Sequence, residues 1–126
     1  MKVYKLKAFA RFQRREKLND AKLAAAVKRL EEGHTGADLG GGLLKLRIAR
    51  PGQGKSGGWR TVIAYRRGER AVYLFGFAKS DRDNIDDDEL EALRTRGRAF
   101  LALSAAQITK AIAEGDMMEV DYDKAD

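Results

Sequence analysis

Three strand-like segments follow one another between residues 44 and 79, and they constrain the fold more than any other feature. The segment 44–48 alternates apolar and charged residues, and the segments 59–66 and 72–79 are rich in β-branched and aromatic residues. Only Arg67-Gly68-Glu69 separates the second segment from the third, and Gly68 can take the positive φ that a tight turn requires. We therefore expect three neighbouring antiparallel strands.

Cations are placed in these segments so that they could meet on one surface. Leu44, Leu46 and Ile48 alternate with Lys45 and Arg47, so the two cations share the strand face opposite the apolar side chains. The other two segments contribute further cations. The expected basic cluster consists of Lys45, Arg47, Arg60, Lys79 and Arg82. Guanidinium and ammonium groups gathered in this way suit a phosphate-rich partner such as RNA.

The rest of the chain predicts helices packed against this sheet. Cap and periodicity signals predict a strand at 3–7, a helix from about Phe9, a helix between Asn19 or Asp20 and Gly33, a helix that starts at the acidic run 86–89, a helix opened by Ser104 and Gln107, and a short strand at 117–120. The glycine cluster 38–42 is expected to be a turn. The order β-α-α-β-β-β-α-α predicts an α+β fold with a small antiparallel sheet. We expect one domain over residues 1–126, with a partly flexible acidic tail at 116–126.

Charge along the chain indicates a polyanionic partner. The net charge is +6, but residues 1–82 carry 20 Lys and Arg against 7 Asp and Glu, a local net charge of +13. Such a field attracts polyanions, although basic residues also serve simply to keep small proteins soluble. The chain has no cysteine, which excludes disulfides and thiolate chemistry, and no apolar run of signal-peptide or membrane-span length. We therefore expect a cytoplasmic protein without a membrane partner.

The loop at 49–56, ARPGQGKS, fits a relaxed phosphate-loop pattern. A phosphate loop must lead into a helix, whereas this one leads into the strand-like sequence WRTVIAY, so a basic hairpin loop is the better interpretation. From this region we expect RNA contacts by Arg50, Lys55 and Trp59. Alternation places Trp59 on the face opposite Arg60, where core packing is a more common role for tryptophan than stacking on bases.

Neither a histidine site nor a metal site is expected. The single histidine, His34, follows a predicted helix end and is interpreted as a solvated loop residue. The acids Asp81, Asp83 and 86–88 surround a predicted helix start, where carboxylates cap the helix and can pair with Arg82. We therefore expect no metal and no cofactor.

Two blocks of sequence carry a family resemblance: DLGGGLLKLRIARPGQGKSGGWRT at residues 38–61 and YLFGFAKSDRDNI at residues 73–85. Through them the chain resembles the RelE/ParE superfamily of bacterial toxins, and most closely its HigB-like branch. The resemblance implies a RelE-like microbial ribonuclease fold and a toxin that cuts mRNA on the ribosome. It also implies a cognate antitoxin, for which a small helix-turn-helix protein is expected.

The resemblance also implies an active site. In RelE-type members the site combines a lysine-bearing strand, a Gly-aromatic-Arg strand start and a basic segment after the last central strand. Here these positions are Lys45 and Arg47, then Gly58-Trp59-Arg60, then Lys79 and Arg82. The sequence departs from RelE at one point, because RelE has a catalytic tyrosine after the last basic segment and this chain has Asn84-Ile85-Asp86 there.

Cleavage of RNA by such a site would need neither histidine nor metal. RNA supplies its own nucleophile, the 2′-hydroxyl, so the protein must align the reacting atoms, stabilise negative charge and assist proton transfer. Arg60 and Arg82 suit bidentate contact with the phosphate, and Lys45 or Lys79 could act as base or acid. The sequence thus predicts a metal-independent endoribonuclease.

Three other interpretations remain open. A ParE-like protein of the same fold would inhibit DNA gyrase, a role that gives no evident reason for the basic cluster. A non-catalytic nucleic-acid-binding module would use the same cations only to hold phosphates. A degenerate toxin, kept for antitoxin binding, is consistent with the missing tyrosine.

Overall fold

The computed structural model describes residues 1–52, 57–82 and 84–125. In chain order the elements are β1 (Lys2–Leu6), α1 (Lys7–Glu16), α2 (Asp20–Glu31), β2 (Ala37–Gly40), β3 (Leu43–Ile48), β4 (Trp59–Arg66), β5 (Arg70–Ala78), α3 (Asp87–Leu101), α4 (Ala105–Ala113), β6 (Met117–Val120) and the short 3-10 helix η1 (Tyr122–Lys124). Within the described ranges, no helix is long and apolar enough to cross a membrane.

The six strands form one mixed sheet in the order β2-β3-β4-β5-β1-β6. All neighbours are antiparallel except β1 and β5, which run parallel with Lys2 opposite Arg70 and Lys5 opposite Tyr73. The α+β class with an antiparallel sheet is confirmed, and the β1–β5 pair is its one parallel exception among the described strands. The first strand lies between β5 and β6 rather than beside the strand that follows it in the chain, and no local sequence signal reports that placement.

The glycine cluster at 38–42 is only partly the expected turn. Ala37–Gly40 forms the edge strand β2, and the turn is confined to Gly41 and Gly42, whose φ values are +63° and +83°. Asp38 accepts a hydrogen bond from the Gly40 N–H at 2.8 Å, and the register with β3 shifts between these two residues. Glycine contributes little side-chain packing to a strand, which is why sequence patterning missed β2.

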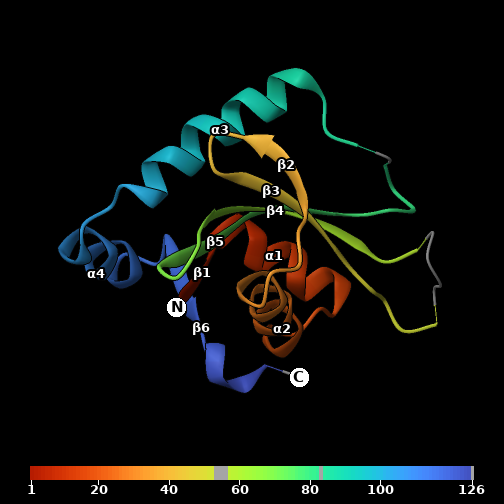
Figure 1. The fold of residues 1–126 in the computed structure, drawn as a ribbon, viewed down its shortest axis with the longest axis horizontal. Coiled ribbons are helices and arrows are strands. Elements are labelled where there is room, and N and C mark those ends of the chain that lie inside the picture. The colour runs from red at the N-terminus through yellow and green to blue at the C-terminus, as the bar shows by residue number, and fades with distance from the viewer. Residues whose placement is uncertain (53–56, 83, 126) are drawn as a thin grey trace.

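Helices cover both faces of the sheet (Figure 1). On one face, α1 and α2 pack over a buried cluster that includes Phe9, Leu23, Val27, Ile63 and Tyr73. On the other face, α3 packs over a second cluster that includes Leu43, Val62, Val72, Leu74 and Leu93. The sheet is therefore buried from both sides, and the predicted alternation of Leu46 and Ile48 toward the first cluster is confirmed.

Helix starts follow the predicted capping signals. The Asn19 side chain accepts a hydrogen bond from the Lys22 N–H at the start of α2. Asp86 and Glu89 form a complete capping box at the start of α3, and Ser104 and Gln107 form another at the start of α4. Each pair satisfies two backbone donors that the helix leaves open, so these boundaries are fixed by local sequence.

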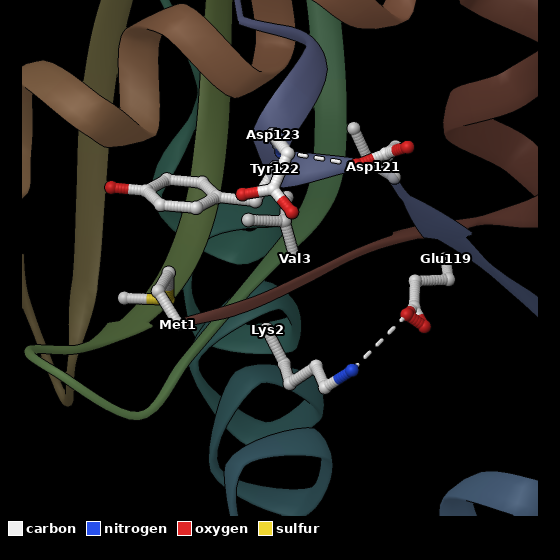
Figure 2. Close-up of a pocket in the computed structure, with 8 residues that line it drawn as sticks. Met1, Lys2, Val3, Glu119, Asp121, Tyr122 and Asp123 are labelled. Carbon is white, nitrogen blue, oxygen red and sulfur yellow. Dashed lines mark hydrogen bonds and ion pairs between the residues drawn. The ribbon is translucent and has the colours of Figure 1, made fainter.

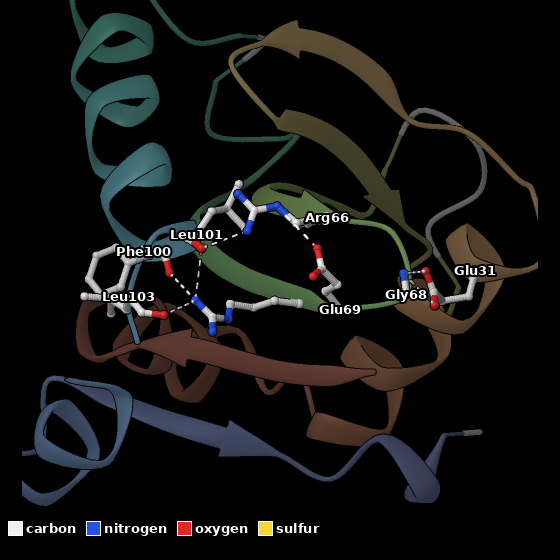
Figure 3. A network of polar contacts seen from close by, with 8 residues as sticks. Glu31, Arg66, Gly68, Glu69, Phe100, Leu101 and Leu103 are labelled. Carbon is white, nitrogen blue, oxygen red and sulfur yellow. Dashed lines mark hydrogen bonds and ion pairs between the residues drawn. The ribbon is translucent and has the colours of Figure 1, made fainter. Parts of the chain in front are cut away.

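The far end of α3 is held by arginines of the β4–β5 hairpin (Figure 3). The Nη1 atom of Arg70 donates hydrogen bonds to the carbonyls of Phe100 at 2.9 Å, Leu101 at 3.1 Å and Leu103 at 3.0 Å. Arg66 donates a further bond to the Leu101 carbonyl at 3.2 Å. These cations satisfy carbonyls that the helix end leaves open and oppose the negative end of its dipole, so they anchor α3 to the sheet.

Candidate nucleic-acid interface

Two rows of side chains cross β3, β4 and β5 on the face where α3 packs. Directly opposed residues of antiparallel strands lie on the same face. The strand registers give the rows Arg47–Arg60–Phe77 and Lys45–Val62–Phe75. The structure thus brings Lys45, Arg47 and Arg60 together on one surface, as the sequence predicts, and it places two phenylalanine rings beside them.

Arg47 and Arg60 are directly opposite one another in the β3–β4 ladder. Arg47 is exposed and Arg60 is half-buried. Partial burial, and secondly the charge of Arg47, lower the pKa of Arg60, although a guanidinium still stays charged at neutral pH. Like charges in opposed positions destabilise a sheet, and local conflicts of this kind are expected at functional sites.

Arg82 reaches the same surface from the loop after β5. Its guanidinium carbon lies 5.8 Å from the centre of the Phe75 ring and 5.5 Å from that of Phe77. The guanidinium is also bonded to the carboxylate of Glu89 in α3: Nη1 donates to Oε2 at 3.1 Å, and Nη2 donates to Oε1. Arg82 is therefore fixed between an aromatic platform and a carboxylate.

Asn84 connects Arg82 to Lys45. The Nε atom of Arg82 donates to the Asn84 carbonyl at 3.0 Å, and the Lys45 ammonium donates to the Asn84 side-chain oxygen at 3.4 Å. We call the surface formed by Lys45, Arg47, Arg60 and Arg82 the basic face. Asn84 belongs to the segment Asn84-Ile85-Asp86, where the resemblance places a tyrosine, and it joins two members of this face.

Sequence reasoning missed the supporting residues of the basic face. Glu89 was assigned only to helix capping, yet its carboxylate accepts from Arg82 as well as from the Asp86 N–H. Phe75 and Phe77 alternate along β5, so their shared face could have been found from the two-residue period of a strand. The contact between Arg82 and Glu89 depends on how the chain turns into α3, which no local pattern reports.

The hydrogen bonds between Arg82 and Glu89 shift the pKa values of both side chains. The hydrogen bonds from Arg82, followed by the one from the Asp86 N–H, lower the pKa of Glu89 from its usual 4.5 to about 2. The hydrogen bond with Glu89 in turn raises the pKa of Arg82. Glu89 is thus ionised at neutral pH and far too weak a base for proton transfer there.

Lys79 follows directly after β5, at the end of the sheet where the basic face lies. Its backbone N–H donates to the Gly58 carbonyl at 3.0 Å, which ties it to the start of β4. Gly58 has a φ of +92°, and a Cβ there would lie 2.8 Å from the Ile48 carbonyl oxygen. The close approach of β3, β4 and the end of β5 at this point therefore requires glycine.

Trp59 and Arg50, two of the predicted RNA-binding residues, lie on the side of the sheet where α1 and α2 pack. Trp59 is only 2% exposed and packs on the α1–α2 side, where its indole N–H donates to Glu16 at 3.0 Å. A ring so buried offers no face on which a base could stack. Arg50 lies over the Trp59 ring and pairs with Glu16 at 3.6 Å, on that same side. Lys55 lies outside the described residues.

Other candidate sites are weaker. His34 lines a small hollow with Arg29 and Arg47. Among residues 1–52, 57–82 and 84–125, no group of three or more histidines and acids is placed to hold a metal ion. A hollow of about 700 Å³ lies between β1 and the C-terminal residues (Figure 2). Its lining has three acids, Glu119, Asp121 and Asp123, against one lysine, Lys2, which pairs with Glu119, so it suits phosphate poorly.

Comparison with known proteins identifies the family. The profile of the RelE toxin of the RelE/RelB toxin–antitoxin system matches residues 1–120. No curated protein matches the sequence. The family match covers every strand of the sheet and all of the residues of the basic face. The chain therefore belongs to the RelE toxin family of the RelE/RelB toxin–antitoxin system.

Proposed function

We propose that this toxin is an endoribonuclease that cleaves mRNA at the basic face. The observation that carries the proposal is the directly opposed pair Arg47 and Arg60, to which Lys45 and Arg82 are added on the same sheet face. A phosphodiester bound between them would relieve the repulsion, and its negative charge would increase during cleavage.

The reaction we propose uses the RNA as its own nucleophile. The 2′-hydroxyl oxygen forms a bond to the adjacent phosphorus while the bond from phosphorus to the 5′ oxygen breaks. A base takes the proton of the 2′-hydroxyl, and an acid gives a proton to the departing 5′ oxygen. The products are a 2′,3′-cyclic phosphate and a 5′-hydroxyl, and no metal or cofactor is required.

We propose separate roles for the arginines Arg60 and Arg82 and for the two lysines. Arg60, half-buried beside Arg47, contacts the non-bridging phosphate oxygens and stabilises the added charge. Arg82 contacts the same phosphate from the side of Phe75 and Phe77. Lys45 and Lys79 are the candidates for proton transfer.

Tyrosine does not fill the proton-transfer role in this proposal. The Tyr65 hydroxyl donates to Glu31, and burial followed by that bond raises the pKa of Tyr65. The Tyr73 hydroxyl donates to the Leu23 carbonyl at 2.7 Å, and burial raises the pKa of Tyr73. Both rings lie on the face opposite the basic face. A site without a strong base would gain most from a partner that aligns the 2′-hydroxyl, so we propose that cleavage depends on the ribosome.

We also propose a family branch, an antitoxin and a cellular location for this toxin. The blocks at residues 38–61 and 73–85 support membership of the HigB-like branch, with a small helix-turn-helix protein as antitoxin. Translating ribosomes as the site of action would place the toxin in the cytoplasm. A gyrase-inhibiting function has no structural observation in its favour.

The test is translation in vitro of a labelled mRNA, with the 5′ ends of its fragments mapped by primer extension. The native toxin, Arg60→Ala and Lys79→Ala are compared, with and without ribosomes. In-frame cleavage by the native toxin that requires ribosomes and fails in both variants supports the proposal. Binding of mRNA without fragments would favour a non-catalytic module, and intact mRNA without binding would turn attention to DNA gyrase.

A further inference from the structure

Exposed cations of α1 and α3 line two adjoining hollows beside the basic face. The first hollow, about 430 Å³, is lined by the cations Lys7, Arg11 and Arg96 and by apolar residues that include Phe100. The second, about 230 Å³, is lined by Arg11, Arg15 and Phe75. Both hollows share Ala8 and Arg11 in their walls, so they follow one another along α1.

The second hollow leads onto the basic face. Phe75, which lines it, is the ring over which the Arg82 guanidinium lies at 5.8 Å. Gly76 also lines it, and a Cβ there would lie 2.5 Å from the Phe12 ring, so α1 sits directly against this part of β5. An extended ligand strand that is bound on the basic face and continues past Phe75 would therefore reach Arg15 and Arg11 next.

The cations along α1 are free to take a partner. Within the described ranges, Lys7, Arg11 and Arg96 form no side-chain hydrogen bond or ion pair, and Arg15 contacts only the Phe12 ring, at 5.8 Å. Some arginines elsewhere on the surface are paired, namely Arg50 with Glu16, Arg66 with Glu69 and Arg94 with Glu91. Asp116 is the one acid among the described residues that line either hollow.

We propose that Lys7, Arg11, Arg15 and Arg96, which we call the α1 track, bind single-stranded RNA next to the cleaved phosphodiester. The inference rests on the proposed function and specifies its substrate further. Unpaired cations along a groove can follow a phosphate backbone, and the half-exposed rings of Phe75 and Phe100 give bases a surface on which to stack. Stacking of this kind requires bases that are not paired in a duplex, which is why we assign the track to a single strand.

The test measures binding without chemistry. A fluorescent 2′-O-methyl RNA of about ten nucleotides, a length within the usual range of single-strand sites, has no free 2′-hydroxyl and cannot be cut. Its affinity is measured by anisotropy over a series of salt concentrations. The test variant is Arg11→Gln with Arg15→Gln. The matched control is Arg14→Gln with Lys17→Gln, which removes two exposed cations of the same region that line a different hollow.

The test variant should bind the RNA about tenfold more weakly than the control, because it loses phosphate contacts that the control keeps. Both variants carry the same net charge, so general electrostatic attraction does not explain such a difference. The slope of log affinity against log salt should fall by about 1.4 in the test variant, about 0.7 for each lost phosphate contact. Equal affinities of the two variants, or no binding of this RNA by the native toxin, would overturn the inference. Loss of antitoxin binding with unchanged RNA binding would also overturn it and assign the track to a protein partner.

The experiments distinguish a failure of the α1 track from a failure of the proposed nuclease function. A native toxin that binds the uncleavable RNA through Arg11 and Arg15 but never cuts mRNA on ribosomes keeps the track and removes the nuclease. A toxin that cuts mRNA while its Arg11 and Arg15 variant binds RNA like the control keeps the nuclease and removes the track.

Discussion

The guanidinium of Arg82 and the carboxylate of Glu89 face each other through two hydrogen bonds, and both side chains are about one-third exposed, at 35% and 34%. Glu89 also accepts from the Asp86 N–H in the capping box of α3. One carboxylate thus starts the helix and orients a cation of the basic face. The proposed function requires that Arg82 be placed before RNA arrives, and Glu89 shares that placement with the Asn84 carbonyl and the rings of Phe75 and Phe77.

Glu89→Gln should change the pH dependence of folding stability. The folded-state pKa of Glu89, about 2, lies below its usual 4.5, so its ionised form stabilises the fold above pH 4.5. That contribution is lost as the pH falls from 4.5 toward 2. Glutamine keeps the capping-box geometry but has no charge. Urea midpoints should therefore be lower for the variant at pH 7, and the gap should close toward pH 2.5. An equal gap at both pH values would contradict the charge pairing.

Arg60→Gln and Arg60→Lys should separate charge from geometry. Both variants should lose cleavage by about 100- to 1000-fold, by analogy with a lost oxyanion donor, because lysine cannot reproduce bidentate contact with a phosphate. Removal of the charge opposite Arg47 should leave the thermal midpoint of the glutamine variant unchanged or raised. Single-turnover cleavage on ribosomes and a thermal melt check both points, and full activity of the lysine variant would argue against bidentate contact.

Gly97→Ala should destabilise the protein although it replaces glycine within a helix. Helix propensity alone would favour alanine by about 1 kcal/mol. A Cβ at Gly97, however, would lie 2.6 Å from Leu43 Cδ2, and Leu43 is fully buried, so a shift of its side chain would disturb the packed core around it. Overpacking of this kind costs about 1–3 kcal/mol, so we expect a net loss in urea unfolding. Ala99→Gly, at an exposed site of the same helix, is the control for propensity. Stabilisation by Gly97→Ala would show that α3 does not lie this close to β3.

Arg70→Gln should lower the free energy of unfolding by about 1–3 kcal/mol, since it leaves carbonyls at the end of α3 without their donor. Arg70 serves three carbonyls, whereas Arg66 serves only that of Leu101 and is more exposed. Arg66→Gln, the matched control, should therefore cost clearly less. Equal losses for the two variants would contradict the role of Arg70 as the anchor of α3.

Local patterns predicted the parts of this fold that local physics determines. Asn19, Asp86 and Ser104 begin helices because their side chains satisfy nearby backbone donors. Strand β4 occupies the predicted range 59–66, and alternation correctly placed Trp59 on the face opposite the cations. The parallel pairing of β1 with β5 depends on contacts distant in sequence, which is why patterning did not reveal it.

In the candidate site, too, some positions follow from local sequence and others depend on contacts distant in sequence. Lys45, Arg47 and Arg60 share a face because β3 and β4 pair in register, and alternation within each strand was enough to predict it. Arg82 belongs to a loop, and its position depends on Glu89 and on two rings of β5. The catalytic and RNA-binding roles of these residues stay predictions.

The most direct test of the central claim is cleavage on the ribosome of an mRNA that carries one 2′-deoxynucleotide at the position mapped as the cleavage site. The proposed function predicts that the native toxin leaves this bond intact, cuts the all-ribose mRNA there, and leaves a 2′,3′-cyclic phosphate on the upstream fragment. Unchanged cleavage of the 2′-deoxy mRNA, or an upstream fragment with a 3′-hydroxyl, would contradict attack by the 2′-hydroxyl at the basic face.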